Sequence, residues 1–436
     1  MKKLDKLIEW VFYLFLFLLP WQTRLIVKEG ILNGGYWEWG TISLYGLDIV
    51  FILLAILFCF KNLTYFKNDE DKCLMPTKMF SLVVGFVVFT LISIFWAKDS
   101  SLAFYWWLRI LQGAILFFLI QKIDFSLLKA GLSLAFAGLI QFILTAYQFV
   151  SQEMFSSKWL GVASQGLLQP GTSIVETTEG RILRVYGSLP HPNIFAGFLI
   201  FLIFILFVLY SYAKKSWQRN FVLFSSLLIT ISLFLTYSRA AWIALILNII
   251  LLGISIFKKS AVKFRQPFFE FFGLVLVVII VFSSISLRDL MVRVEGSGRL
   301  ETRSLNERVL NFQRGEKIIQ ENPLFGVGVG NYTLALFEKY PHLSSWDYQP
   351  IANIYLLVLV EMGLIGFFLF LLMFGFTFLR FGFNIYSPIL VSLLVIGFFD
   401  HWLFSLPFGI ILLWLSLGLV WKRCQKHELT GEESFF

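Results

Sequence analysis

Long apolar stretches recur along the whole chain and limit what it can fold into. Twelve of them are close to the roughly 20 residues that a helix needs to cross the hydrocarbon core of a bilayer. Across the sequence 58% of residues are hydrophobic and only 14% are charged, which excludes a soluble globular protein. We predict an all-α polytopic membrane protein of about 12 transmembrane helices, over residues 5–20, 42–60, 79–96, 103–121, 127–150, 190–213, 220–236, 239–257, 268–287, 363–382, 388–404 and 407–421.

Basic residues indicate the orientation, because Lys and Arg flank membrane helices mainly on the cytoplasmic side. If the N-terminus is inside, the inside segments carry more than half of the 36 Lys and Arg residues, and the short outside loop 97–102 carries only Lys98. We therefore expect both termini in the cytoplasm. The net charge of +9 then reflects topology, and no nucleic-acid partner is expected. The first apolar run lacks a small-residue cleavage site and is predicted to be a retained helix.

Metal and cofactor sites find little support in the sequence. The chain has only four histidines, and three of these lie in segments assigned to the outside. Residues 326–330 alternate Gly and Val but follow a helical pattern rather than a strand, so they are not a dinucleotide motif. We expect no cofactor and no metal, and no disulfide framework either, because the cysteines lie in or beside cytoplasmic segments (Cys59, Cys73 and Cys424).

Two loops on the predicted outer side are long, at residues 151–189 and 288–350. The second precedes span ten and is predicted to be mainly helical, with a helix over 306–320. The cations assigned to the outside are mostly arginines, which favours bidentate binding of phosphate or carboxylate. The alternative for each single residue is an ordinary surface arginine on a loop helix. The arginines of the second loop are Arg288, Arg293, Arg299, Arg303, Arg308 and Arg314.

The chain divides at this loop into three predicted regions. Residues 1–287 hold spans one to nine and the outer loop 151–189. Residues 288–362 hold the large outer loop and a short apolar, re-entrant segment, and we expect the active site there. Residues 363–436 hold the last three spans and a cytoplasmic tail.

Charged and polar residues at the outer ends of helices are the candidates for chemistry. Arg239 begins an apolar helix at a hairpin tip, where a charge needs water, protein or an anion; simple snorkelling is the alternative. Arg109 lies in a helix within reach of the outer surface, and can bind a lipid phosphate or snorkel. His191 and Asn193 flank Pro192 at another helix end, where a local capping role is equally compatible with the sequence.

Two further candidates lie later in the chain. Asp400 and His401 end a predicted helix on the same face, but neighbours on a helix point apart, so a pair is not assumed. Trp346, inside the large loop, is a candidate for stacking on a sugar, whereas tryptophans in membrane proteins more often form interfacial belts.

Several local motifs, in order and on one side of the membrane, resemble the O-antigen ligase and polymerase superfamily, bacterial membrane proteins of C-type glycosyltransferase architecture. His191-Pro192-Asn193 and Asp400-His401-Trp402 are similar to recurring elements of that family. The other matching motifs are Thr236-Tyr237-Ser238-Arg239-Ala240-Ala241-Trp242, Asn306-Glu307-Arg308 with Asn322-Pro323-Leu324-Phe325-Gly326-Val327-Gly328, and Pro350-Ile351-Ala352-Asn353-Ile354-Tyr355-Leu356 with Glu361-Met362-Gly363.

The resemblance implies a location in the bacterial inner membrane with the active site facing the periplasm. It implies transfer of a glycan from undecaprenyl pyrophosphate to a glycan, a lipid core or a protein, in the synthesis of lipopolysaccharide or another envelope polysaccharide. The transfer would be metal-independent and inverting, with a His general base. Pyrophosphate binding falls to Arg239 and Arg308, with Arg314 and Arg109 as further candidates, and the catalytic and glycan-contacting or structural positions are Ala352, His401, Asn353, Glu361, His191, Asn193, Trp346 and Tyr355.

Ala352 departs from the family pattern, because it stands where the family has its His base. Three explanations stay open: an engineered inactive variant, a natural degenerate homologue, or a base supplied by another group such as His342 or His401. Two other functions also stay open. The chain can be a non-catalytic binder of lipid-linked glycan, or a transporter of lipid-linked sugars, although the charges sit at helix ends and no repeat is visible.

Ala352→His distinguishes these explanations in a glycan-transfer assay with purified protein. A gain of transfer is expected if the alanine removed the base. No gain, together with loss of transfer in His401→Ala, is expected if another histidine is the base.

Overall fold

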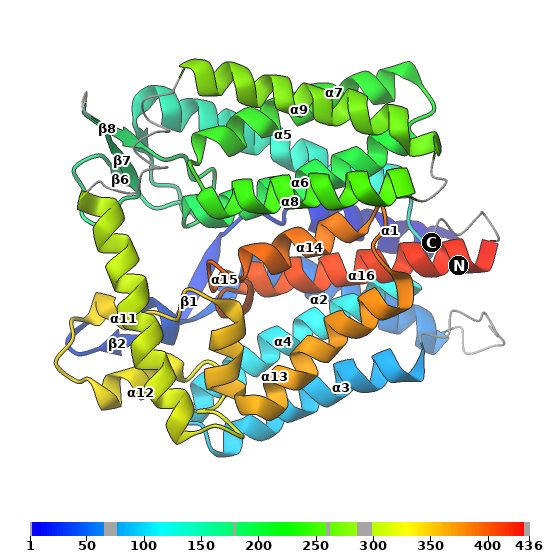
Figure 1. The fold of residues 1–436 in the computed structure, drawn as a ribbon. Coiled ribbons are helices and arrows are strands. Elements are labelled where there is room, and N and C mark those ends of the chain that lie inside the picture. Colours follow the sequence, from blue (N-terminus) through cyan, green and yellow to red (C-terminus); the bar gives the residue numbers. More distant parts are fainter. Residues whose placement is uncertain (1, 65–75, 178–179, 259–261, 286–298, 431–436) are drawn as a thin grey trace.

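The computed structural model describes residues 2–64, 76–177, 180–258, 262–285 and 299–430. Most of the long helices lie side by side (Figure 1). Within the described residues, nine are long and apolar enough to cross a membrane. They are α2 (Gly46–Thr64), α3 (Thr77–Ile92), α4 (Ser100–Lys122), α5 (Leu127–Ser151), α6 (Pro192–Tyr212), α7 (Ser216–Leu235), α8 (Arg239–Lys258), α9 (Arg265–Ile285) and α13 (Ile354–Phe381).

The prediction of an all-α, multi-pass membrane protein is confirmed, but the count of twelve uniform spans is not. Three predicted spans fall on shorter apolar elements. Residues 5–20 correspond to α1 (Lys2–Phe17), and residues 407–421 to the apolar part of α16 (Pro407–Thr430). Residues 388–404 were predicted as one helix, and that was wrong: α14 (Ser387–Ile396) and α15 (Trp402–Ser405) are separate.

The break between α14 and α15 has a packing cause. The first turn of α13 is inserted against it, and the backbone N–H of Ile354 donates to the carbonyl of Gly397 at 2.8 Å. A Cβ on Gly397 would lie 2.4 Å from a side-chain carbon of Ile354. The sequence pattern shows that residues 388–404 are apolar, but not that another helix end replaces their backbone hydrogen bonds.

Helix α6 is the centre of one half of the bundle. It packs against α5, α7, α8, α9 and α14, and 94% of its most apolar window is buried. A helix that is apolar on every side is expected to be surrounded by other helices. Its first residue, Pro192, follows the N-cap His191, so the most buried of the nine long spans begins at one of the sequence-predicted sites.

The other half of the bundle contains a buried ion pair. Arg109 of α4 and Asp48 of α2 are 2.6 Å apart, with side chains 8% and 5% exposed. Gln112 also donates to Asp48, at 2.9 Å, and the backbone carbonyl of Ser43 accepts from Arg109 at 2.6 Å. Arg109 therefore neither snorkels nor faces an open site, because protein groups surround its charge.

Among the described residues, one end of the bundle carries the long connections 18–45, 152–191 and 322–353, and we call it the loop end. Helix α11 (Arg299–Glu321) runs across it from the strands β7 and β8 toward α12 (Tyr332–Lys339), while α1 begins and α16 ends at the opposite end (Figure 1). The loop end also carries four two-stranded antiparallel sheets. Their strands are β1 (Arg24–Lys28), β2 (Ile31–Leu32), β3 (Gly35–Tyr36), β4 (Ile42–Tyr45), β5 (Glu153–Met154), β6 (Gln165–Gly166), β7 (Ile174–Thr177) and β8 (Gly180–Leu183). Arg288 and Arg293 lie outside the described residues.

A glycine-rich loop follows α11 in the chain and packs against an interruption in α13. Helix α13 is interrupted at Gly363, which has φ of 59°, and residues 323–330 fill the interruption. The backbone N–H groups of Val327 and Gly328 donate to the carbonyls of Val360 and Glu361, at 3.0 and 2.9 Å. Because a Cβ on Gly326 would lie 2.4 Å from the Glu361 backbone, only glycine allows this approach. The predicted boundary between residues 362 and 363 falls at this interruption.

Asp48→Ala is expected to lower the free energy of unfolding by about 3–5 kcal/mol, because it leaves the Arg109 charge buried without its partner. Denaturant titration in detergent micelles measures it. The control is Glu338→Ala, which removes the half-exposed pair of Glu338 with Lys98 and should cost at most about 1 kcal/mol. Equal losses for the two variants would show that the buried pair is not a main stabilising contact.

Candidate functional site

A cavity of about 810 Å³ lies at the loop end. Its walls come from four separate parts of the chain: residues 22–45, residues 154–194, the stretch from α11 to residue 352, and residues 400–407. A volume of this size is typical of ligand sites. Seven residues singled out from the sequence line it, namely His191, Asn193, Arg308, Trp346, Ala352, Asp400 and His401.

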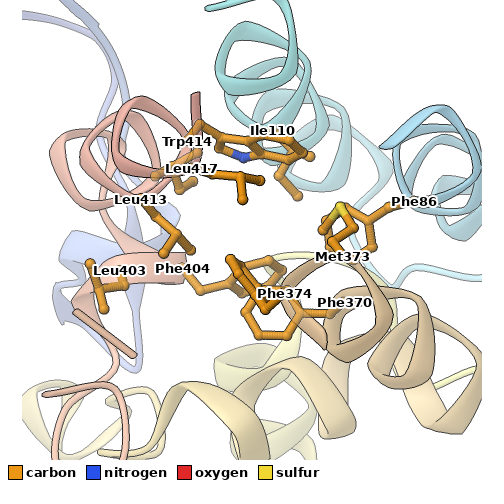
Figure 2. Close-up of a pocket in the computed structure, with 11 residues that line it drawn as sticks. Phe86, Ile110, Phe370, Met373, Phe374, Leu403, Phe404, Leu413, Trp414 and Leu417 are labelled. Carbon is orange, nitrogen blue, oxygen red and sulfur yellow. The ribbon is translucent and has the colours of Figure 1, made fainter. Parts of the chain in front are cut away.

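A second cavity lies within the bundle and differs in kind. Its wall is entirely apolar and comes from α3, α4, α13, α15 and α16, with side chains such as Phe86, Met373 and Trp414 pointing into it (Figure 2). Its volume is about 10 Å³, near the minimum for one water molecule. This space is a packing defect rather than a substrate site.

A chain of hydrogen bonds at the large cavity joins three segments: residues 184–193, the turn at Thr236 and the turn at Asp400. The buried guanidinium of Arg184 donates to the Asn193 side chain at 2.7 Å, and its Nε donates to the carbonyl of Thr236 at 2.8 Å. Asn193 in turn donates to Asp400 Oδ2 at 3.2 Å, while Asp400 Oδ1 accepts from the His401 backbone N–H at 2.8 Å. Asp400 thus accepts hydrogen bonds on both oxygens, and Asn193 links it to the guanidinium of Arg184.

His191 is a fixed part of this wall. The backbone N–H of Asn193 donates to His191 Nδ1 at 3.1 Å, so in the neutral ring the proton is on Nε2, which donates to Ser173 Oγ at 3.0 Å. Burial, followed by the charge of Arg184, lowers the pKa of His191 to about 3. With both nitrogens engaged and the ring neutral, His191 caps α6 and positions Asn193 rather than accepting a proton.

His401 has a different arrangement. The Ser405 hydroxyl donates to the carbonyl of His401 at 3.1 Å and lies 2.6 Å from Nδ1. Because its own proton is used, Ser405 Oγ accepts a hydrogen bond from Nδ1–H. Nε2 then carries the lone pair, and it has no hydrogen-bond partner among the residues that the structure describes. The ring of Trp39 packs edge-to-face on the imidazole, with centroids 5.0 Å apart, and holds its orientation.

The charges around His401 favour a neutral ring. Burial lowers the pKa of His401, the positive charge of Arg308 lowers it further, and the negative charge of Asp400 opposes both. Burial would raise the pKa of Asp400, but the hydrogen bonds from the His401 backbone N–H and the Asn193 side chain favour the carboxylate, and the pKa of Asp400 is lowered. A neutral imidazole with a free Nε2 can accept a proton near neutral pH.

Arg308 is the arginine that faces this site. It lies on the cavity side of α11 with Ser304, Glu307 and Asn311, and no described residue forms an ion pair with it. The neighbouring Arg303 instead pairs with Glu307 at 2.8 Å on the exposed part of the helix. An unpaired guanidinium at a cavity wall is suited to bind an anion.

Ala352 also lines the cavity, and the residues after it hold it beside the break before α15. Asn353 donates to the carbonyl of Phe398 at 3.1 Å and caps α13, and Tyr355 donates to the carbonyl of Leu394 at 2.7 Å. Neither side chain lines the cavity. In the structure both position the chain at residue 352 rather than contact a substrate.

The remaining predicted site residues also lie outside the cavity wall. Glu361 accepts from the backbone N–H of Gly330 at 2.8 Å and belongs to the glycine-rich junction. Arg314 lies over the Tyr340 ring at 5.7 Å, and Arg109 is in the buried pair with Asp48. Arg239 begins α8, close in sequence to Thr236 but not part of the wall, and His342 is exposed.

Sequence reasoning overlooked the wall formed by residues 22–45. Arg24, Tyr36, Glu38 and Trp39 all line the cavity. A usable signal was present: Asn33 and Gly34, with φ of 50° and 75°, form the tight hairpin turn that Asn-Gly pairs favour. This ordered turn holds the aromatic residues that follow it against the site.

Comparison with known proteins identifies a family match in the part of the chain that includes α11 and Ala352. Residues 224–371 match the family model described as O-antigen ligase (Wzy_C), which is about a third of the sequence. The match contains Arg239, Arg308, Ala352 and Glu361 but neither His401 nor residues 22–45. No curated protein matches the chain. The resemblance predicted from the motifs is confirmed, because the match over residues 224–371 supports a relation to the O-antigen ligase and polymerase superfamily.

Proposed function

We propose that the chain transfers a glycan from undecaprenyl pyrophosphate to an acceptor hydroxyl in the loop-end cavity, by a metal-independent and inverting reaction. Transfer of the O-antigen ligase type is supported at the level of the family. The observation that carries the finer proposal is the presence, in one cavity, of an unpaired arginine and a neutral histidine with a free nitrogen. We further propose that the cavity faces the periplasm and that both termini are cytoplasmic.

Arg308 is assigned to the donor. A pyrophosphate leaving group gains negative charge as its bond to the sugar breaks, and a fixed guanidinium stabilises that charge without having to reorganise. Arg239 can act only as a second contact, since it does not line the cavity in this conformation. The α11 helix thus holds the donor cation over the site.

His401 is assigned as the general base. The acceptor oxygen attacks the anomeric carbon while its proton passes to Nε2 of His401, and the bond from that carbon to the phosphate oxygen breaks. The electron pair leaves with undecaprenyl pyrophosphate, whose charge lies beside Arg308. Attack from the side opposite to the leaving group inverts the anomeric configuration. Ser405 and Trp39 hold the imidazole, and Asp400 stabilises the imidazolium that forms.

A second function keeps specific support from Ala352. Its methyl group lines the cavity at the position where the family has its base, so a protein that binds the donor without transferring it has the same donor wall. Donor binding with no transfer, even at high acceptor concentration, is the expected behaviour in that case. Transfer to an acceptor, scored as single addition or as a ladder of lengths, identifies a ligase or a polymerase.

Arg308→Ala is expected to reduce the transfer rate by about 10²–10³-fold, as for loss of one electrostatic contact to a leaving group, and to weaken donor binding. The assay uses purified protein with undecaprenyl-pyrophosphate glycan. Lys317→Ala, which removes an exposed cation from the same helix, is the matched control and should retain the wild-type rate. Donor binding that survives both Arg308→Ala and Arg239→Ala contradicts the assigned donor site.

The pH dependence tests His401. Since the base must be neutral and its pKa is lowered, the rate should stay level near neutral pH and fall only when acid protonates the ring. Arg308→Gln removes a charge that lowers the pKa of His401, so the acid limb should move to higher pH. Asp400→Asn removes a charge that raises it, so the limb should move to lower pH. Shifts in the same direction, or none, are incompatible with His401 as the base.

A further inference from the structure

We infer that residues 22–45 form a binding subsite for an uncharged sugar and that this sugar carries the acceptor hydroxyl. The inference rests on the proposed transfer reaction and adds to it the chemical class of the acceptor, a saccharide rather than a protein side chain. The subsite consists of Arg24, Tyr36, Glu38 and Trp39, together with Trp346 from the short turn 345–347 that contacts β3, all on the cavity wall.

Position is the first argument. Trp39 contacts the imidazole of His401 edge-to-face, and Glu38 is the preceding residue. A ligand held on this wall therefore lies beside the proposed base. In a transfer reaction, the substrate beside the base is the one that loses a proton, which is the acceptor. The donor cation Arg308 belongs to a different wall, formed by α11.

Hydrogen-bonding capacity is the second argument. Arg24 and Glu38 form a bidentate pair, with N–O distances of 2.5 and 3.0 Å, and the Tyr36 hydroxyl donates to the same carboxylate at 2.5 Å. The pair is electrically balanced, and its side chains are 27% and 36% exposed. A guanidinium has five N–H donors, and Arg24 uses three of them on Glu38 and the Tyr36 hydroxyl. N–H groups therefore remain for a ligand, and the Glu38 carboxylate can accept further hydrogen bonds. Neighbouring donors and acceptors without net charge suit the hydroxyl groups of a neutral pyranose.

Aromatic surface is the third argument. Tyr36 and Trp346 are 51% and 68% exposed, although both line the cavity. Aromatic rings with one polar edge combine apolar contact with hydrogen bonding, which matches the C–H faces and hydroxyl edges of a sugar ring. An acidic sugar gains little here, because Arg24 is already occupied by Glu38.

The wall is also rigid, which favours a binding role. The Asn33 side chain donates to the carbonyls of Pro341 and Leu343, at 3.3 and 2.5 Å, and so ties the hairpin to the segment that holds Trp346. A Cβ on Gly35 would lie 2.2 Å from Ser345 Oγ. The two faces of the subsite are therefore fixed to each other before any ligand binds, which reduces the entropic cost of binding.

The test measures binding without catalysis. Purified protein in nanodiscs is titrated with neutral tetrasaccharides (maltotetraose, cellotetraose and mannotetraose) and with tetragalacturonate, followed by saturation-transfer NMR. At least one neutral probe should bind. In Arg308→Gln, which lacks the guanidinium that would attract an anion to the same cavity, it should bind more tightly than the acidic probe. Glu38→Gln and Trp346→Ala should each weaken that binding by roughly tenfold, the size of one or two lost contacts. Tyr36→Phe, which removes only a hydroxyl, replaces any variant whose melting temperature falls.

The matched controls change residues of the same types outside the cavity wall. Glu29→Gln changes an exposed carboxylate of the same segment, and Trp159→Ala removes a tryptophan that is 83% exposed; neither residue lines the cavity, and both variants should bind like wild type. No binding of any neutral probe, preference for the acidic probe in Arg308→Gln, or equal effects of site and control variants overturns the inference. Sugar binding that depends on Glu38 in a protein without transfer leaves the subsite standing and removes the proposed reaction. Transfer whose acceptor KM is unchanged by Glu38→Gln keeps the proposed reaction and removes the subsite.

Discussion

Backbone hydrogen bonds at the break between α14 and α15 are the contacts on which the site depends. A helix interrupted inside an apolar bundle leaves carbonyl and N–H groups that water cannot reach, and such groups are costly unless protein atoms satisfy them. Here the start of α13 supplies the partners, from Asn353, Ile354 and Tyr355 to the carbonyls of Phe398, Gly397 and Leu394. The same contacts bring residue 352 and His401 onto one cavity wall. The interruption is thus the reason that residue 352 and His401 share one wall.

The arginines show how local partners decide the role of a charge. From the sequence, Arg239 and Arg308 were the first candidates to bind an anion, and Arg314 and Arg109 were further ones. In the structure Arg109 is neutralised by Asp48 and Arg314 lies on an aromatic ring, whereas Arg308 lies on the cavity wall without an ion-pair partner in the described part of the chain. Arg184, which the motifs did not single out as a site residue, holds Asn193 and Thr236 together instead.

Much of the helical layout followed from the sequence, because apolar length alone selects membrane helices. The interruption of α13 at Gly363, where the tenth span was predicted to begin, and the helix within residues 306–320 could also be predicted, since glycine and proline mark them. The span itself begins earlier, at Ile354. Two features were not. The break in residues 388–404 depends on a tertiary contact with α13 that no periodicity reveals, and the role of residues 22–45 depends on their docking against residues 341–345 and His401. The roles predicted for His401 and Arg308 still await the experiments above.

The four-part construction of the cavity has a consequence for how such a protein can diversify. Residues 224–371, the part shared with the O-antigen ligase family, supply α11 and residue 352 but not the hairpin at residues 22–45 or the turn at 400–401. In the proposed reaction, recognition of the acceptor and binding of the donor are encoded in separate stretches of the gene. Substitutions in the short N-terminal hairpin would then change which acceptor is used while residues 224–371 stay unaltered.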